Sequence, residues 1–379
     1  MTMTTTTTTP ETKTVLVIGA TGKQGRAFIR SLLFPPSTST PSSPTTITPP
    51  PTKSENWHIL ALTRDASALP AQALLGEAKQ HNATSKISLV EACLNTPSTL
   101  RAVFESHPNI YSVFVVLAYP GLGTPVIAQK EKAQGTLIAD LAVEFGVKLF
   151  VYSSTIPIGP DPSDGIDESR KQKREVEHYI EDLGKKNPEL KWIVIRPGFF
   201  YENLEGVFGA IGATMYRDGL KKETTLTMVA SEDLGRVVAG LLQNPEPYIN
   251  KFLCVTSGPM TMREVLDAHK RATGKPMPAA PGFLGWILLK INKGAQDLVR
   301  EAEINHANRT SGRLPTFEEE VERAKSVCEL QTYEQWKRAL VSGECGVDEL
   351  ARSGSTDGRR ASTSSWNNLS LMKLLTGRS

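Results

Sequence analysis

A glycine-rich stretch between an apolar strand and an amphipathic helix constrains this chain more than any other feature. Residues 15–18 predict a buried strand and residues 25–33 predict the helix after it. Glycines are needed where a chain turns tightly, where backbone approaches a pyrophosphate and where a helix packs on a strand, and the helix N-terminus then faces the anion. The spacing is GxxGxxG rather than GxGxxG, so it matches a dinucleotide fingerprint in mechanism but not letter for letter. We expect a dinucleotide here, with a plain strand–turn–helix as the alternative, in the loop Gly19-Ala20-Thr21-Gly22-Lys23-Gln24-Gly25.

The rest of the chain alternates short apolar runs with helical patterns, which is typical of a parallel sheet with crossover helices. Further helices are expected in residues 124–145 and around residues 176–183, the latter ending at a Gly184 cap. The predicted fold class is α/β, a Rossmann-type doubly wound parallel sheet with a smaller C-terminal α/β lobe. The expected strands cover residues 15–18, 58–63, 87–91, 113–117, 148–152 and 192–195.

Shifts in composition predict how the chain is divided. Residues 12–200 are expected to form the Rossmann-type domain, and residues 201–341 the smaller lobe that contacts a substrate or partner, with a strand at 251–255. Three segments contain too little apolar surface to offset the entropy lost on ordering, and we expect them to be disordered. They are the threonine-rich residues 1–11, a Pro/Ser/Thr-rich insertion at residues 35–55 and the polar tail at residues 342–379.

Composition excludes several functional classes. A net charge of +3 on 379 residues, with the basic residues scattered, argues against direct nucleic-acid binding. The four cysteines, Cys93, Cys254, Cys328 and Cys345, have no metal-binding spacing, so neither a metal site nor a disulfide scaffold is expected. No signal peptide is recognisable, and the most apolar stretch, residues 281–291, is too short to span a bilayer. We expect a cytoplasmic protein without a membrane partner, and a nuclear location as well stays open.

Arg64 is the candidate residue for choosing the cofactor. It follows the second predicted strand in Ala-Leu-Thr-Arg64-Asp65, where the ribose of a dinucleotide is read. An acid there accepts from a free 2′-hydroxyl and marks NAD, whereas an arginine pairs with a 2′-phosphate and marks NADP. Arg64 favours NADP. Two alternatives stay open: Asp65 would face the ribose if the register slipped by one, or Arg64 is simply a solvated arginine on a loop.

Several stretches resemble the NmrA-like family of atypical short-chain dehydrogenase relatives. They follow the family's order and together cover most of residues 12–340. The most specific are the loop Gly-Ala-Thr-Gly-Lys-Gln-Gly and the segment RPGFFYEN at residues 196–203. The others are ALTRD, GTLIADLAVEFGVKLFVYSST, KREVEHYIEDL, SEDLGRVVAGLL and TYEQWKRAL.

The resemblance implies an NADP cofactor, with NAD the less favoured choice, and it carries the family's contacts onto particular residues. Two positions depart from the family pattern. Ala92-Cys93 stands where the family has Gly-Asp, which removes a carboxylate on the adenine side, and Ala133 replaces a lysine. The implied contacts are Gly19–Gln24 for the pyrophosphate, Arg64 for the 2′-phosphate, Leu117, Ala118 and Tyr119 for the nicotinamide ribose, and Lys173, Phe200, Tyr201, Glu202 and Asn203 for the nicotinamide side.

Lys173 is the candidate catalytic residue. It shares one helical stripe with Val176 and Ile180, and a lysine on the apolar side of a helix can bind ribose hydroxyls or move a proton. A snorkelling lysine at the helix edge is the alternative. Related short-chain enzymes use Tyr-x-x-x-Lys, but the tyrosine position here is Ser169, whose hydroxyl is a far poorer acid. Residues 153–155 follow a strand where those enzymes keep a catalytic serine, although such residues more often bond their own turn.

Two functions therefore stay open. The first is an NADP-dependent oxidoreductase that reduces a small carbonyl, enone or quinone without the usual dyad, with Lys173 as the candidate lysine that acts in place of the tyrosine dyad. The second is a non-catalytic sensor that binds the dinucleotide and regulates a protein partner such as a transcription factor, as NmrA-like repressors do. The broken dyad favours the sensor. Lys173 and the aromatic turn at residues 199–201 favour the enzyme, which we take as the first hypothesis.

Overall fold

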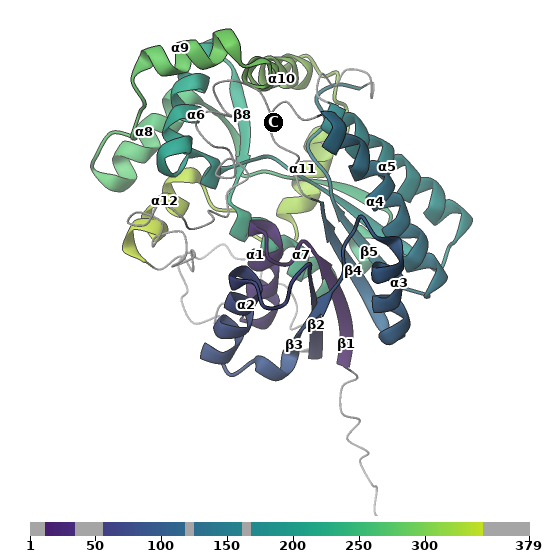
Figure 1. Cartoon of the computed structure of the whole chain (residues 1–379). Helices are drawn as coiled ribbons and strands as arrows, with labels where there is room; N and C mark the ends of the chain where they lie inside the picture. Colours follow the sequence, from purple (N-terminus) through teal and green to yellow (C-terminus); the bar gives the residue numbers. More distant parts are fainter. Residues whose placement is uncertain (1–11, 35–55, 118–124, 161–167, 344–379) are drawn as a thin grey trace, which may run out of the picture.

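The protein is built around a seven-stranded sheet in which every pairing is parallel (Figure 1). The computed structural model describes residues 12–34, 56–117, 125–160 and 168–343. The strand order β3-β2-β1-β4-β5-β6-β9 reverses between β1 and β4, which is the switch point where doubly wound sheets bind ligands. The strands are β1 (Thr12–Ile18), β2 (Asn56–Thr63), β3 (Ile87–Glu91), β4 (Ile110–Val116), β5 (Leu149–Ser153), β6 (Lys191–Pro197) and β9 (Lys251–Val255).

Helices cover both faces of this sheet, so its strands are apolar on both sides. In β1, Val15 and Val17 pack into one core, and Leu16 and Ile18 into the other. The first core is covered by α1 (Lys23–Leu33), α2 (Leu69–Gln80), α7 (Ser231–Gln243) and α11 (Phe317–Lys325). The second is covered by α3 (Pro97–Ser106), α4 (Pro125–Glu144) and α5 (Glu168–Lys186) (Figure 1). The predicted Rossmann-type fold class is confirmed.

A smaller lobe with its own core lies against the sheet domain. Its three-stranded sheet has the order β10-β8-β7, and Met228, Tyr201 and Trp336 lie in its core. The elements of the lobe are β7 (Phe199–Phe200), β8 (Thr225–Val229), β10 (Gly258–Thr261), α6 (Gly206–Gly219), α8 (Met262–Thr273), α9 (Gly282–Ile291), α10 (Lys293–Thr310) and α12 (Tyr333–Ser342).

Some elements of residues 201–341 belong to the sheet domain rather than to this lobe. β9 pairs with β6 as the seventh strand, α11 packs on β9, and α7 packs on α1. The contact between α1 and α7 is close, because a Cβ atom at Gly235 would lie 2.7 Å from the Phe28 nitrogen. The chain therefore returns to the sheet domain twice after residue 201.

One local prediction was wrong. Gly184 does not cap a helix but lies inside α5, where a Cβ atom would lie 2.7 Å from Nε1 of Trp192, so the glycine makes room for that ring. The tail was expected from about residue 342, and the last helix of the described residues, α12, ends at Ser342 with Gly343 as its left-handed C-cap at φ 79°. The predicted disordered segments at 1–11, 35–55 and 344–379 lie outside the described residues. Within those residues, no helix is long and apolar enough to cross a membrane.

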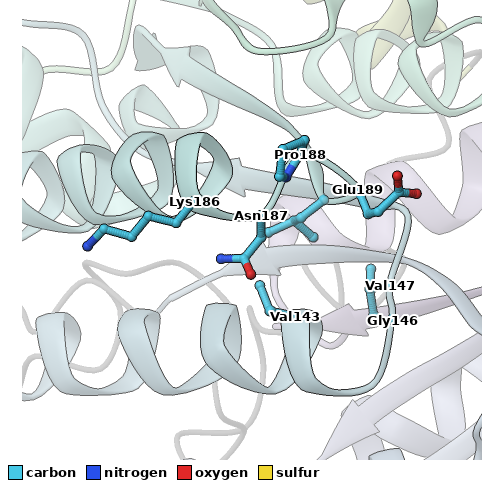
Figure 2. A pocket seen from close by; sticks show the side chains of 8 residues that line it. Val143, Gly146, Val147, Lys186, Asn187, Pro188 and Glu189 are labelled. Carbon is cyan, nitrogen blue, oxygen red and sulfur yellow. The ribbon is translucent and has the colours of Figure 1, made fainter.

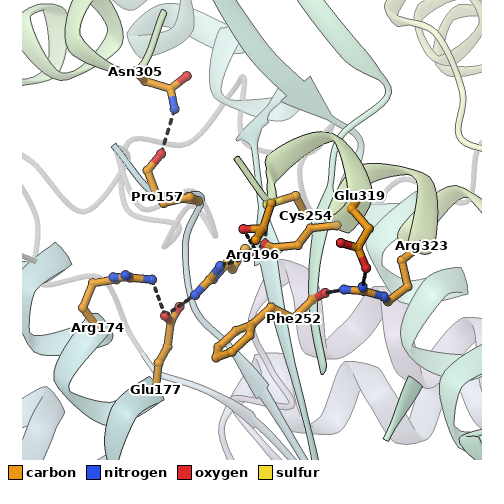
Figure 3. Close-up of polar contacts among 11 residues, drawn as sticks. Pro157, Arg174, Glu177, Arg196, Phe252, Cys254, Asn305, Glu319 and Arg323 are labelled. Carbon is orange, nitrogen blue, oxygen red and sulfur yellow. Dashed lines mark hydrogen bonds and ion pairs between the residues drawn. The ribbon is translucent and has the colours of Figure 1, made fainter. Parts of the chain in front are cut away.

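A buried ion-pair network joins α5, β6, β9 and α11 on the inside of the sheet domain (Figure 3). Arg196 on β6 binds Glu177 with Nη2 to Oε2 at 2.7 Å, and it binds Glu320 with Nη1 to Oε2 at 2.9 Å. The thiol of Cys254 donates to the same Glu320 carboxylate at 3.1 Å. Burial works to raise the pKa of Glu177, but Arg196 outweighs it and the pKa lies below its ordinary value. Burial also raises the pKa of the Cys254 thiol, so we expect it to stay protonated and unreactive.

Candidate functional site: a dinucleotide cradle at the switch point

The loop between β1 and α1 lies at the carboxyl edge of the sheet and is shaped by its glycines. Gly19 has a φ of +84°, a left-handed conformation, and a Cβ atom there would overlap the carbonyl oxygen of Val116 on β4. A Cβ atom at Gly25 would overlap the Gly19 oxygen and lie 2.8 Å from the Ala20 Cα. The backbone therefore closes on itself at a point where no side chain fits.

The helix after this loop starts earlier than expected. α1 begins at Lys23 rather than at residue 25, and its N-cap, Gly22, has no side chain to bind the first backbone N–H groups. The Gly22 N–H itself donates to the Gly19 oxygen at 3.0 Å. A helix that begins without a side-chain cap leaves N–H donors and the positive end of its dipole for an anion.

Two side chains of the loop connect it to neighbouring strands. The Ser153 hydroxyl, at the end of β5, donates to Oε1 of Gln24 at 2.6 Å. This bond brings one of the serines that followed the fifth predicted strand to the loop itself. Lys23 acts electrostatically on Glu202 in the turn after β6: burial raises the pKa of Glu202, while the bond from Ser231 and the charge of Lys23 oppose that rise. The charge of Lys23 in the loop is therefore felt by the carboxylate in the turn after β6.

Arg64 is exposed directly after β2, on the same edge of the sheet. It makes no hydrogen bond or ion pair with another residue of the described part of the chain. Asp65, by contrast, is engaged in its own turn, where Oδ1 accepts from the Ser67 N–H at 2.8 Å and from its hydroxyl at 2.6 Å. These bonds hold the pKa of Asp65 below its ordinary value. Of the two residues that could bind the ribose or its 2′-phosphate, Arg64 is the one whose charged group has no partner among the described residues.

Of the three residues predicted to contact the nicotinamide ribose, only Leu117 is among the residues that the structure describes. Leu117 follows β4 with its side chain buried, 4% exposed, in the second core of the sheet domain, so the approach to a ribose would come from its backbone. Ala118 and Tyr119 lie outside the described residues.

Lys173 is buried and paired. Its Nζ donates to Oε1 of Glu131 on α4, and the Ser169 hydroxyl donates to Oε2 of the same carboxylate at 3.3 Å. The hydroxyl of Tyr152 on β5 is 3.5 Å from Oε1 of Glu131, and burial raises the pKa of Tyr152 well above its ordinary value. The alternative of a snorkelling lysine at the helix edge is therefore wrong. The sequence did not reveal Glu131, because its position opposite Lys173 depends on the packing of α4 on α5.

The residues of the turn after β6 differ in burial and in their contacts. Tyr201 is fully buried in the lobe core, and its hydroxyl bonds to Ser257 and to the Gln331 carbonyl oxygen. Its side chain is thus a packing element of the lobe, and the prediction that Tyr201 contacts the nicotinamide side stays a prediction. Phe200 and Asn203 are half-buried. Glu202 accepts from the N–H and hydroxyl of Ser231 at 2.8 and 2.6 Å, so it fixes the start of α7.

The segment after β5 is connected to the lobe by side-chain hydrogen bonds. Arg170 donates to Thr155 at 2.7 Å and to Glu301 on α10 at 2.7 Å. Asn305 and Asn308, also on α10, donate to the carbonyl oxygens of residues 157 and 158 at 2.8 and 3.0 Å. These bonds hold α10 against the segment that follows β5.

A surface hollow of about 290 Å³ lies elsewhere. It is formed by the residues that precede β5 and β6, including Val147, Asn187 and Pro188, at the amino edge of the sheet (Figure 2). Ligands of doubly wound sheets bind at the carboxyl edge, so this hollow has no part in the site. The described residues contain no cluster of His, Cys, Asp and Glu that could hold a metal ion.

Comparison with known proteins agrees with this fold. The NmrA-like family domain-containing oxidoreductase ptmS of Penicillium ochrochloron is 25% identical over 311 residues, covering 76% of this chain and 81% of that protein. A solved structure of Nmra, a negative transcriptional regulator, in complex with NAD has a TM-score of 0.60 at 18% identity and covers 88% of this chain and 96% of its own. Its complex with NADP has a TM-score of 0.58 at 18% identity and covers 89% and 98%. The sequence pattern of the NmrA-like family matches residues 11–339, and the chain therefore belongs to the NmrA-like family.

Proposed function

We propose that the protein binds a nicotinamide dinucleotide at the carboxyl edge of its sheet and prefers NADP(H) to NAD(H). The main observation is the shape of the loop at residues 19–25. Its backbone is packed so closely that a Cβ atom at Gly25 would not fit, and the helix that follows the loop starts without a side-chain cap. The residues present fit the group, since a pyrophosphate needs such N–H donors and close backbone. Arg64 is exposed at the ribose position and supports NADP(H). The Nmra complexes with NAD and NADP support a dinucleotide of this class.

Replacing Arg64 with alanine is expected to remove most of the preference for NADPH. A charge-assisted contact to the 2′-phosphate contributes roughly a ten- to hundredfold preference, and NADH lacks that phosphate. NADPH affinity should therefore fall by this factor while NADH affinity changes little, as measured by quenching of protein fluorescence. Asp65→Ala serves as the neighbouring control and should leave both affinities unchanged. A loss of NADH affinity equal to that of NADPH would contradict the assignment of Arg64.

We propose further that the protein is an oxidoreductase that reduces a small carbonyl, enone or quinone. A bound NADPH supplies the hydride for such a reduction. The chain supplies the surroundings: Lys173 lies in α5, one helical turn after Ser169, which stands in the tyrosine position of related enzymes, and both side chains bind Glu131. The bonds from Arg170 and α10 hold the segment after β5 in place beside that group. The naming of the Penicillium relative as an oxidoreductase supports this proposal.

The proposed chemistry is tested by following NADPH oxidation with a panel of quinones and enones. We expect turnover with at least one of them, and we expect Lys173→Ala to lower kcat by roughly a hundredfold, a typical contribution of a positioned acid or base. NADPH affinity should change much less than kcat. Lys132→Ala is the matched control, because Lys132 lies on the surface in an exposed pair with Glu175. Turnover that is unaffected by Lys173→Ala would remove this residue from the mechanism.

A second candidate function is a non-catalytic sensor that binds the dinucleotide and regulates a protein partner in the cytoplasm or nucleus. It is favoured by one observation: Ser169 stands in the tyrosine position, and both Ser169 and Lys173 bind Glu131. Both side chains thus have a partner within the chain without a substrate. Tight NADPH binding without turnover of any quinone or enone would favour the sensor over the enzyme.

A further inference from the structure

Helix α9 presents an apolar, aromatic face to solvent. Phe283, Trp286 and Ile291 expose 62%, 60% and 56% of their surface, and all three belong to this one helix. The other large exposed apolar residues among those described, Leu69 and the valines at 207 and 341, lie on three different helices. Exposed apolar residues that stand alone are ordinary, whereas a cluster that includes two aromatic rings marks a contact surface.

The packing of α9 on α6 decides which face is exposed. A Cβ atom at Gly285 would lie 2.8 Å from Cγ2 of Thr214 on α6, so α9 lies close to α6 on this side. Leu288, three residues on, is buried on the same side. Phe283, Trp286 and Lys290 have the helical spacing of i, i+3 and i+7, which places them together on the opposite face.

Positive charge surrounds this apolar face. Lys290 is exposed with Nζ 6.0 Å from the centre of the Trp286 ring, and Lys293 is exposed at the start of α10. Between Asp267 and Asp297 the chain has no acidic residue. Aromatic and aliphatic side chains flanked by lysines, in a stretch of sequence without acidic residues, are typical of segments that lie in the interface of an anionic membrane.

We propose that α9 binds the surface of a membrane that contains anionic lipids. Phe283, Trp286 and Ile291 enter the boundary between headgroups and acyl chains, and Lys290 and Lys293 remain at the lipid phosphates. Binding of this kind needs no spanning helix, and it departs from the expectation, drawn from the sequence, that the protein has no membrane partner. A second copy of the chain is a poorer occupant, because a symmetric contact through this face would bring the same lysines of both copies together. The proposal goes beyond the proposed cofactor and reaction and does not depend on either.

The test is sedimentation of the full chain with vesicles of phosphatidylcholine alone and of phosphatidylcholine mixed with phosphatidylserine. We expect binding to the mixed vesicles that weakens as salt is raised, and little binding to phosphatidylcholine alone. The double variant Phe283→Ser, Trp286→Ser should bind at least about tenfold more weakly. Lys290→Gln and Lys293→Gln should each weaken binding by roughly fivefold. A blue shift of tryptophan emission on binding should disappear in Trp286→Phe.

Leu69→Ser is the matched control, because Leu69 is a comparably exposed apolar residue on α2, and it should bind vesicles like the unchanged chain. The melting temperature of each variant should equal that of the unchanged chain, which shows that a loss of vesicle binding is not caused by unfolding. No binding of the unchanged chain to the mixed vesicles would overturn the proposal. The proposal would also be overturned if the unchanged chain formed a dimer without lipid in analytical ultracentrifugation and the double variant were monomeric. The apolar face would then be covered by a second copy of the chain.

Discussion

Substitution of Gly25 by alanine is expected to abolish measurable dinucleotide binding while the sheet domain stays folded. The added methyl group would overlap the Gly19 oxygen and lie 2.8 Å from the Ala20 Cα, and both of these are backbone atoms that cannot move aside cheaply. The loop would open, and the N–H groups that face the pyrophosphate would be misplaced. Loss of two charge-assisted hydrogen bonds corresponds to roughly a hundredfold to ten-thousandfold in affinity.

The control for this prediction is Gly76→Ala in α2. A Cβ atom at Gly76 has no neighbour within 4 Å, so the substitution adds a methyl group without a clash. It should leave NADPH affinity unchanged and raise stability slightly, because alanine favours a helix more than glycine does. Both variants are measured by NADPH titration and by urea unfolding. Normal NADPH affinity in folded Gly25→Ala would show that the pyrophosphate does not bind at this loop.

The second large effect is expected for Arg196→Met, and it concerns stability rather than binding. The variant leaves the buried carboxylates of Glu177 and Glu320 without the guanidinium that bonds to both. Removing one partner of a buried pair costs roughly 3–5 kcal/mol, which is a large part of the stability of an ordinary domain. Urea unfolding measures the loss. Arg101→Met, which breaks the exposed pair with Glu144, is the control and should have little effect.

The pH dependence of this loss has a defined sign. Arg196 holds the pKa of Glu177 below its ordinary value despite burial, so the pair stabilises the fold above that ordinary value. The stabilisation is lost as the pH falls through the depressed pKa, where Glu177 takes up a proton. The difference in unfolding free energy between the unchanged chain and Arg196→Met should therefore narrow below the ordinary titration range of glutamate. A difference that stays constant into acid would show that lost packing, and not lost charge pairing, causes the destabilisation.

Features encoded locally were predictable from the sequence. The strand at residues 15–18 and the loop after it follow from apolar runs and glycine spacing, and the structure places both as expected. The apolar run predicts burial on both faces, which matches the division of Val15 and Leu16 between two cores. Such patterns depend only on neighbours along the chain.

Features that depend on contacts between distant segments were not predictable. Gly184 has the sequence position of a helix cap, but α5 continues to Lys186. The glycine is needed instead because the ring of Trp192, a residue of β6, packs against it. The apolar strand β9 was assigned to the lobe, and its pairing with β6 in the large sheet carries no local signal. The same holds for Glu131, which faces Lys173 only because α4 and α5 pack together. Tyr201 stands in a family motif, yet its ring packs beside Tyr333 and Trp336 in the lobe core.

The most direct test of the proposed function is a calorimetric titration of the full chain with NADPH and with NADH under the same conditions. The arrangement of the loop and Arg64 predicts that NADPH binds one site with a Kd of about 1 μM or lower, and at least about tenfold more tightly than NADH. Equal affinity for the two cofactors would contradict the role of Arg64. No binding of either would contradict the central claim that the loop at residues 19–25 holds a dinucleotide.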